Sequence, residues 1–163
     1  TATHKIIEFI DFSKADDIES EIERLYEWQY ISEREARAVS RKKLKDFFNS
    51  SLFARINASP LVKREMRFLT EMPASAVDPP LKGQFDGESI IVQGAVDLCF
   101  IEDGEIVVVD FKTDRTDNPD DLAAAYGEQL SIYAAACEKI FEKKVKQKII
   151  YSFALSSEVE VFR

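Results

Sequence analysis

Residues 94–112 read Gly-Ala-Val-Asp-Leu-Cys-Phe-Ile-Glu-Asp-Gly-Glu-Ile-Val-Val-Val-Asp-Phe-Lys, and this stretch decides the fold. Two runs rich in β-branched and aromatic residues, 89–101 and 105–111, lie on either side of Asp103-Gly104. An Asp-Gly pair between two such runs is a strong signal for a tight β-turn. The stretch therefore predicts a β-hairpin, and apolar residues on both of its faces indicate a sheet that helices cover on both sides.

The predicted hairpin brings two acids together. With Asp103 and Gly104 in the loop, Asp97 lies directly opposite Asp110, and the side-chain period of two places Lys112 on the same face as Asp110. Facing carboxylates repel each other, and burying them is costly unless something compensates. A proton, an ion pair with Lys112 or a divalent cation can each compensate, and the residues alone leave these three open. Two carboxylates suit a hard cation such as Mg²⁺.

The flanking sequence predicts one mixed α/β domain. Residues 1–60 carry helical patterns, including a spacing from Ser32 to Glu35 that is typical of a capping box, and Pro60 is expected to end this helical segment. Residues 61–163 predict a sheet-bearing core, with a strand at 65–69, a loop at 73–80, a helix over 122–141 and closing strands at 145–155 and 159–162.

The composition is that of a folded domain. The chain has 163 residues, of which 45% are hydrophobic, and a formal net charge of −8. Apolar runs fall well short of the roughly 18 residues of a membrane span, so we expect a cytoplasmic protein with no membrane partner. Cys99 and Cys137 are too few for a four-thiolate zinc or iron–sulfur site and are expected to be buried free thiols. The first residue is Thr1 rather than Met, which suggests a piece of a longer chain.

Charge is distributed unevenly along the chain. Residues 34–45 hold six bases and one acid, and residues 139–148 hold five lysines. Acids gather instead at 16–23 and 114–121. The negative net charge therefore does not exclude a nucleic acid partner, because phosphate binding depends on local Lys and Arg. We expect residues 34–45 to form a basic helix that contacts the phosphate backbone without reading bases.

Four motifs, in order, resemble those of a known nuclease family. They are Thr1-Ala-Thr-His4, Gly94-Ala-Val-Asp97, Asp110-Phe111-Lys112 and Gln129-Leu-Ser-Ile-Tyr133. Together they resemble the RecB-like PD-(D/E)XK nuclease family, and most closely the C-terminal nuclease domains of AddA-type helicase–nucleases. The family usually has Arg soon after its first Asp, whereas Leu98 stands there in this chain.

The resemblance implies a restriction-endonuclease-like α/β fold, with a mixed sheet flanked by helices and an N-terminal helical segment. It implies that Asp97, Asp110 and Lys112 are catalytic. It also implies that a metal ion is held by His4, Asp97, Asp110 and the backbone carbonyl of Phe111. The implied cofactor is Mg²⁺, and Mn²⁺ is expected to substitute for it.

The resemblance implies further residues and a biological setting. Gln129 and Tyr133 would lie on the substrate side, and Glu65 is a further candidate. The domain would be the exonuclease of an AddAB- or RecBCD-type helicase–nuclease in double-strand-break repair by homologous recombination. Its substrate would be DNA fed as a single strand by the motor, its partner would be an AddB-like protein, and ATP would act only through the helicase part.

Two other interpretations are weighed against the nuclease. A nuclease-fold domain that has lost catalysis and serves as a structural or DNA-holding module fits the net charge and Leu98. A protein-interaction module would act through the acidic segment 16–23. The facing acids beside Lys112 favour the nuclease, because a purely structural hairpin has no physical need for buried like charges.

Overall fold

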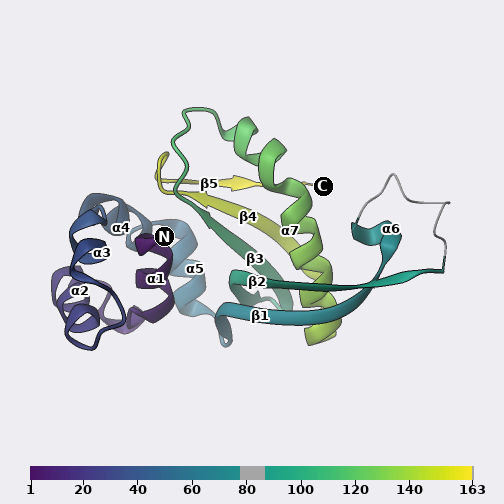
Figure 1. Ribbon diagram of the computed structural model, residues 1–163, viewed down its shortest axis with the longest axis horizontal. Helices are drawn as coiled ribbons and strands as arrows, with labels where there is room; N and C mark the ends of the chain where they lie inside the picture. Colours follow the sequence, from purple (N-terminus) through teal and green to yellow (C-terminus); the bar gives the residue numbers. More distant parts are fainter. Residues whose placement is uncertain (78–86, 163) are drawn as a thin grey trace.

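A five-stranded mixed sheet forms the centre of the molecule (Figure 1). The computed structural model describes residues 1–77 and 87–162. The strands lie in the order β1-β2-β3-β4-β5; β3 and β4 are parallel, and the other neighbours are antiparallel. Their bounds are Val62–Pro73 (β1), Ser89–Glu102 (β2), Glu105–Lys112 (β3), Val145–Ser152 (β4) and Ser157–Glu160 (β5). The observed architecture is the mixed α/β sheet that the sequence predicts.

The first sixty residues are helical, and they cover one face of the sheet (Figure 1). Side-chain oxygens cap these short helices, and the predicted capping box is confirmed: Ser32 and Glu35 bond each other's backbone amides. The largest apolar cluster joins these helices to β2, β3 and β4. The elements are α1 (Ala2–Phe9), the 3₁₀ helix η1 (Phe12–Lys14), α2 (Ile18–Glu27), α3 (Glu33–Ala38), α4 (Arg41–Phe48) and α5 (Ser51–Ala58).

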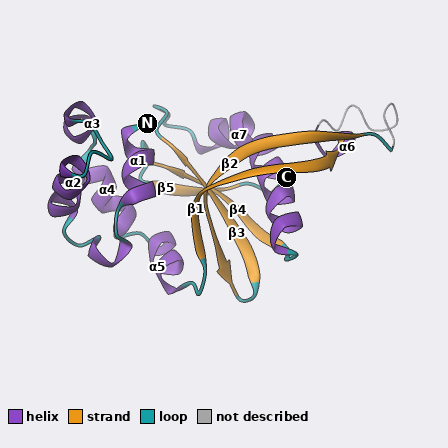
Figure 2. Ribbon diagram, turned by 60° about the horizontal axis from the view of Figure 1, so that its bottom comes forward, coloured by secondary structure: helices purple, strands orange, loops and turns teal. Residues whose placement is uncertain are grey.

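The other face of the sheet is covered by α7, which spans Pro119–Phe141 (Figure 2). Asn118 caps its first turn, and Glu142 ends it in the left-handed conformation. The predicted free thiols Cys99 and Cys137 are confirmed, and both are buried in the cluster between α7 and the hairpin. Helices therefore cover both faces, as the apolar hairpin predicts.

The predicted register of the β2–β3 hairpin is confirmed. Cα pairs run from Glu102–Glu105 at the turn to Leu98–Val109. At the next position, the Asp97 carboxylate accepts a hydrogen bond from the backbone amide of Phe111 at 2.8 Å. The hairpin therefore opens where the two facing acids lie.

Strand β1 changes the face that its side chains present at Glu65, whose φ is +45°. Before this residue, Val62 packs on the cluster of N-terminal helices, and Arg64 donates hydrogen bonds to carbonyls of residues 7 and 10. After it, Met66 and Phe68 pack against α7 instead. All four positions are even, so strict alternation would have kept them on one face.

Strand β2 makes the same change at Asp97. Leu98 packs on the helical side, whereas Val96 packs on the α7 side, although two positions separate them. The pairs Arg64–Leu98 and Met66–Val96 flank the exchange on both strands. Asp97 therefore lies where side chains from both layers of helices can reach it.

Three expectations of local structure need correction. The basic segment 34–45 belongs to two helices. Val39 ends α3, and Ser40 caps α4 by accepting a hydrogen bond from the Lys43 amide. The predicted loop at 73–80 contains the short helix α6 (Ala74–Val77), and its last residues, 78–80, lie outside the described residues. The first closing strand stops at Ser152, because a turn occupies 153–156, and the second spans Ser157–Glu160 rather than 159–162.

The helices of residues 1–77 and 87–162 include none with the length and apolar character needed to cross a bilayer. The longest of them, α7, carries Asp120 and Asp121 in its first turn and Lys139 in its last.

Candidate active site

The two facing carboxylates lie at the open end of the hairpin and are mostly removed from solvent. The Asp110 residue is 3% exposed, and the side chain of Asp97 is 16% exposed. Both belong to elements fixed by the sheet, since β3 lies between β2 and β4. Burying two acids at one point is unfavourable unless their charges are compensated.

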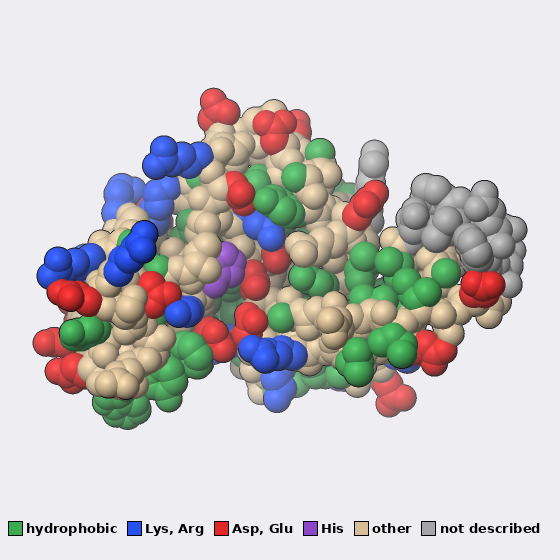
Figure 3. All heavy atoms as spheres, in the orientation of Figure 1, with side chains coloured by type: hydrophobic (Ala, Val, Ile, Leu, Met, Phe, Trp, Pro, Cys, Tyr) green, Lys and Arg blue, Asp and Glu red, His purple; other side chains and the backbone are tan. Residues whose placement is uncertain are grey.

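His4 joins these acids from the far end of the sequence. Its Nε2 lies 2.8 Å from the carbonyl oxygen of Phe111, which is 107 positions away, and 3.4 Å from Asp97 Oδ2. Thr1 caps α1 and its hydroxyl contacts Nδ1 of the same ring. The cap therefore starts the helix and orients the imidazole toward β3. Figure 3 shows this histidine on the surface between the helical segment and the sheet, with acidic side chains beside it.

The environment moves the pKa values of the two acids in opposite directions. Burial, and then the Asp97 charge, raises the pKa of Asp110 to about 6. Burial also acts to raise the pKa of Asp97, but hydrogen bonds from His4 and the Phe111 amide outweigh it and lower that pKa. The hydrogen bond to Asp97 raises the pKa of His4. The site thus favours the ionised form of Asp97 and the protonated forms of Asp110 and His4.

Lys112 brings a positive charge to the buried acid. Its Nζ lies 2.7 Å from Asp110 Oδ2, which confirms the predicted shared face. The pair is an ion pair by distance, but its direction is poor for a hydrogen bond, so Asp110 Oδ2 has no hydrogen-bond partner within the described residues. Gln129 Oε1 lies 3.5 Å from the same ammonium. The structure therefore brings Gln129 beside Lys112, and the predicted substrate-side role of Gln129 stays a prediction.

Tyr133 and Glu65 lie at the margin of this cluster. The Tyr133 ring packs edge-on against Phe68, with centroids 5.8 Å apart. Burial, and then the charges of Asp110 and Asp97, raises the pKa of its hydroxyl. Glu65 is beside Asp97 across the strand pair, and its charge acts on the Tyr133 hydroxyl.

Gly94 of the predicted motif has a packing role. A Cβ built at this position would lie 2.9 Å from Phe68 Cζ and 3.2 Å from a ring carbon of Tyr133. These distances are shorter than carbon atoms tolerate without moving, so a side chain here would displace both rings. The glycine therefore lets Tyr133 approach the strand that carries Asp97.

Two residues that sequence reasoning did not assign to the site also belong to it. The ammonium of Lys112 lies 4.0 Å from the ring centroid of Tyr126, and the Tyr126 hydroxyl donates a hydrogen bond to Asp114 Oδ2 at 3.1 Å. In the sequence, Tyr126 belongs to the apolar stripe of its helix. The spacing of Tyr126 could have indicated its place in the site, because Tyr126 and Gln129 are three positions apart and share a helix face.

The basic segment 34–45 is less available for DNA than its composition suggests. Four of its six bases contact groups of the same chain, and the other two, Arg34 and Lys45, have no such partner within the described residues. The contacts pair Arg37 with Glu33, Arg41 with Glu19 and the Ala36 and Val39 carbonyls, Lys42 with Asp46, and Lys43 with the Phe153 and Ala154 carbonyls.

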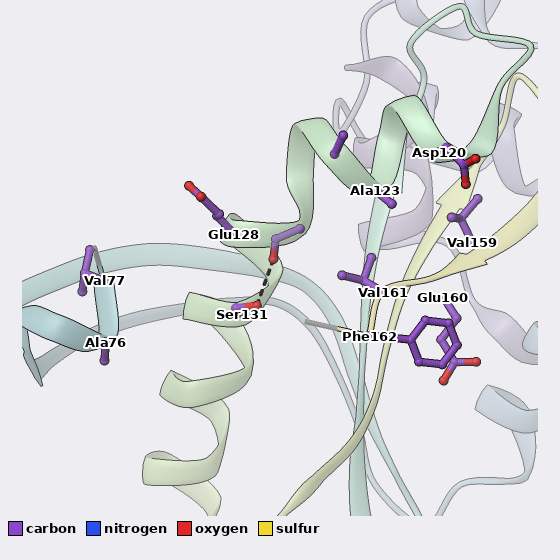
Figure 4. A pocket seen from close by; sticks show the side chains of 12 residues that line it. Ala76, Val77, Asp120, Ala123, Glu128, Ser131, Val159, Glu160, Val161 and Phe162 are labelled. Carbon is purple, nitrogen blue, oxygen red and sulfur yellow. Dashed lines mark hydrogen bonds between the residues drawn. The ribbon is translucent and has the colours of Figure 1, made fainter. Parts of the chain in front are cut away.

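A groove of about 700 Å³ lies elsewhere, between α7 and the end of β5 (Figure 4). Its lining includes Ala123, Glu128, Val159 and Phe162. The predicted site residues are not among the described residues that line it. The groove is therefore separate from the carboxylate cluster.

The donor atoms of the cluster fit a divalent cation. His4 Nε2, Asp97 Oδ2 and the Phe111 carbonyl oxygen are adjacent, and Asp110 Oδ2 is a buried acceptor without a hydrogen-bond partner within the described residues. Carboxylate and carbonyl oxygens with one imidazole suit Mg²⁺ or Mn²⁺. Within the described ranges, the side chains of His, Cys, Asp and Glu do not already form a cluster of three arranged around one point.

The family model described as the PD-(D/E)XK nuclease superfamily matches residues 1–161. The chain belongs to this superfamily. The PD-(D/E)XK assignment agrees with the observed fold, a mixed sheet flanked by helices. Asp97, Asp110 and Lys112, through which the sequence resembles the PD-(D/E)XK signature, lie close together in the structure. Their catalytic role stays a prediction.

Several longer PD-(D/E)XK relatives are AddA proteins, each named as one subunit of an ATP-dependent helicase/nuclease. The protein of Clostridium botulinum is 33% identical over 98% of this chain, and that of Clostridium beijerinckii is 32% identical over 99% of it. The protein of Clostridium kluyveri is 32% identical over 93% of this chain. The chain corresponds to 13%, 14% and 13% of these relatives, respectively. It is thus a nuclease-family domain similar to one part of an AddA protein.

Proposed function

We propose that this chain is a metal-dependent deoxyribonuclease, the exonuclease domain of a helicase–nuclease. One observation carries the proposal: His4 lies 2.8 Å from the Phe111 carbonyl and 3.4 Å from Asp97, at the point where Asp110 and Lys112 meet. Residues from the first helix and from two strands meet there at the buried carboxyl group of Asp110, whose pKa is raised. Packing alone does not favour such an arrangement.

In this proposal the cation is held by His4, Asp97, Asp110 and the Phe111 carbonyl. The cofactor is Mg²⁺, and Mn²⁺ replaces it. A divalent cation in this position supplies positive charge that stabilises the negative charge developing on a scissile phosphate. The carboxylates supply the oxygen ligands, and the neighbouring Phe111 amide keeps Asp97 ionised and in place.

Lys112 has two tasks in the same proposal. Its ammonium, fixed 2.7 Å from Asp110, orients the attacking water and offsets charge on the phosphate. Gln129, 3.5 Å from the same ammonium, and Tyr133 line the substrate side. Glu65, beside Asp97, adds a carboxylate at the rim of the site.

The longer protein is part of the proposal. The AddA relatives are several times longer than this chain, which matches about an eighth of each. We infer that a helicase motor hydrolyses ATP to feed single-stranded DNA to the site, and that the partner protein is AddB-like. The process served is double-strand-break repair by homologous recombination.

A domain that has lost catalysis is the competing function. The internal pairing of most bases in residues 34–45 favours it, because fewer side chains remain to hold DNA. Such a domain would still fold, but it would have no use for a buried acid with a raised pKa. The two functions differ in whether Asp110 matters for hydrolysis and for cation binding.

The test measures cleavage of labelled linear single- and double-stranded DNA with Mg²⁺, with Mn²⁺ and with EDTA. Cleavage is expected with either cation and is expected to stop with EDTA. Asp110→Asn is expected to lower the rate by about 10²–10³-fold or more, because it removes a charged group at the reacting centre. The matched control is Asp103→Asn, the same chemical change in the exposed turn of the same hairpin, which leaves cleavage unchanged.

Calorimetric titration of Mn²⁺ completes the test. The wild type and Asp103→Asn are expected to bind the ion, and Asp110→Asn is expected to bind it much more weakly. If the wild type neither cleaves DNA nor binds Mn²⁺, the nuclease proposal is wrong and the domain that has lost catalysis is correct. Binding without cleavage would indicate a site that needs the rest of the longer chain to receive DNA.

A further inference from the structure

We propose that Tyr126 is a positioning residue for the catalytic lysine, and that Asp114 anchors Tyr126 in that role. The inference rests on the proposed nuclease function, to which it adds two residues that are not among the predicted site residues. The ring of Tyr126 lies under the ammonium of Lys112, at 4.0 Å from centroid to Nζ. The phenol hydroxyl donates to Asp114 Oδ2 at 3.1 Å.

The contact matters because a lysine side chain is long and flexible. The side chain of Lys112 is 17% exposed, so its ammonium is largely surrounded by protein. Asp110 holds it at 2.7 Å from one direction, and Gln129 approaches to 3.5 Å from another. The ion pair with Asp110 is poorly aligned for a hydrogen bond, and therefore does not fix the direction of the N–H groups by itself. The ring face of Tyr126 supplies an attraction that favours one position of the charge.

The ring of Tyr126 is itself fixed at two points. Its body packs on an apolar cluster made by side chains of α7, β4 and the end of the chain, which includes Leu122 and Leu130. Its hydroxyl is tied to Asp114, which follows β3 by two residues. Burial and the bond to Asp114 raise the pKa of Tyr126, so the hydroxyl stays protonated and keeps donating. Tyr126 thus ties the segment between β3 and α7 back onto the helix.

The geometry distinguishes this role from ordinary packing. A residue that only fills space on α7 can be replaced by another apolar side chain of similar volume at small cost. A residue that holds a cation through its ring needs an aromatic face, and leucine has none. Tyr126→Phe keeps the ring and loses the bond to Asp114, whereas Tyr126→Leu keeps apolar bulk and loses the ring.

The kinetic test compares these variants in DNA cleavage under saturating Mg²⁺. Tyr126→Leu is expected to lower kcat about tenfold with KM nearly unchanged, because the misplaced charge acts on the transition state rather than on DNA binding. Tyr126→Phe is expected to keep most of kcat. Asp114→Ala is expected to have the same kcat as Tyr126→Phe. The double variant Tyr126→Phe with Asp114→Ala is expected to have a kcat no lower than either single variant, because both changes remove the same hydrogen bond. The control is Tyr26→Leu, on the exposed surface of α2, which leaves kcat and KM unchanged.

A spectroscopic test does not depend on activity. Protons of the Lys112 ε-methylene group above an aromatic ring are expected to resonate upfield in the wild type and in Tyr126→Phe. In Tyr126→Leu they are expected to return to the ordinary lysine position, while thermal unfolding shows that each variant is folded. If Lys112 shows no ring-current shift in the wild type, or if Tyr126→Leu retains full kcat, the positioning role is wrong.

Failure of the nuclease proposal is distinguishable from failure of this inference. If the wild type has no metal-dependent cleavage, the proposed function fails, and the resonance of Lys112 alone decides whether Tyr126 positions it. If cleavage is present and depends on Asp110, but Tyr126→Leu and Tyr126→Phe behave alike, Tyr126 acts by packing and the inference is overturned.

Discussion

Both ends of the β2–β3 hairpin bring two acids face to face, yet the two ends treat them in opposite ways. At the turn, Glu102 pairs with Glu105 across the strands. Arg55 binds Glu102 through two nitrogens at 2.8 and 2.9 Å, and Lys146 lies 2.8 Å from it. These cations lower the pKa of Glu102 to about 2. At the turn end, the charge of Glu102 is therefore compensated by two cations of the same chain.

At the open end the compensation is incomplete. Asp97 is held by His4 and by the Phe111 amide, whereas Asp110 meets the ammonium of Lys112 without a well-aligned hydrogen bond. Burial dominates there and raises the pKa of Asp110 to about 6. Both ends place acids on facing strands, and they differ in exposure to solvent and in the number of cations.

The difference teaches which acid pairs indicate chemistry. Facing acids that the fold neutralises, as at Glu102, belong to the stability of the hairpin. Facing acids left partly uncompensated in a buried position keep an unfavourable free energy that a cation or a proton can relieve. The signal for function is therefore the incomplete compensation at Asp110, rather than the proximity of like charges.

The largest expected effect comes from removing Lys112, the lysine at the open end, and the lysine at the turn end serves as its control. Lys112→Met is expected to lower the rate of DNA cleavage by about 10²–10³-fold, because it removes the charge that we propose faces the scissile phosphate. Lys146→Met removes a lysine beside the same hairpin. It is expected to leave the rate within about twofold of wild type, because the ion-pair partners of Lys146 among the described residues, Glu102 and Asp103, lie at the turn end. Both rates are measured on the same labelled DNA with Mg²⁺.

Stability must be measured alongside these rates. Lys146→Met is expected to cost only about 0.5 kcal/mol in urea unfolding, since Arg55 still holds Glu102. Equal losses of activity in both variants would show that the lysines act through the fold. The distinction between the two ends would then be wrong.

The hairpin could be predicted from sequence because its determinants are local. Asp103-Gly104 fixes the turn, and the turn fixes the register as far as Leu98–Val109. Asp97 and Asp110 come next on the two strands and lie close enough to interact. The same arithmetic places Lys112 beside Asp110. Helices on both faces follow from apolar side chains on both faces.

Other features depend on tertiary contacts that no local pattern encodes. The change of face at Glu65 occurs at a left-handed residue that is not glycine, so composition carries no signal for it. The basic segment 34–45 has the composition of a free DNA surface, but Arg41 and Lys43 reach partners on α2 and after β4. Tyr126 fits an apolar stripe in the sequence, although its ring also holds an ammonium.

The second effect is on stability, and it has opposite signs at the two ends. Asp110→Asn is expected to raise the free energy of unfolding near pH 7 by about 2 kcal/mol, because the neutral amide avoids burying a charge. Glu102→Gln is expected to lower it by about 1 kcal/mol, a value reduced by solvent screening of a partly exposed pair. Urea unfolding of the two variants measures both. A loss of stability in Asp110→Asn would mean that Lys112 already compensates the acid.

The pH dependence separates the same two variants further. The folded pKa of Asp110, about 6, lies above its ordinary value of 3.8, so the folded state favours the protonated acid. The advantage of Asp110→Asn is therefore full above about pH 6 and vanishes as the pH falls toward about 4. The folded pKa of Glu102 is about 2, below its ordinary 4.5, so Glu102 stabilises the fold above about pH 4.5 and stops doing so as the pH falls toward about 2.

The smallest expected effect is that of Glu105→Gln, which removes one of the facing acids at the turn. Directly opposed like charges on neighbouring strands destabilise a sheet by about 0.2–1 kcal/mol. Arg55 and Lys146 already neutralise Glu102, so the gain on losing Glu105 is expected at the bottom of that range, about 0.2 kcal/mol. Urea unfolding of Glu105→Gln beside Asp110→Asn gives the comparison directly. If Glu105→Gln raises the free energy of unfolding as much as Asp110→Asn does, the acids at the turn are compensated as poorly as those at the open end. Burial of Asp110 would then not distinguish the candidate site from the turn.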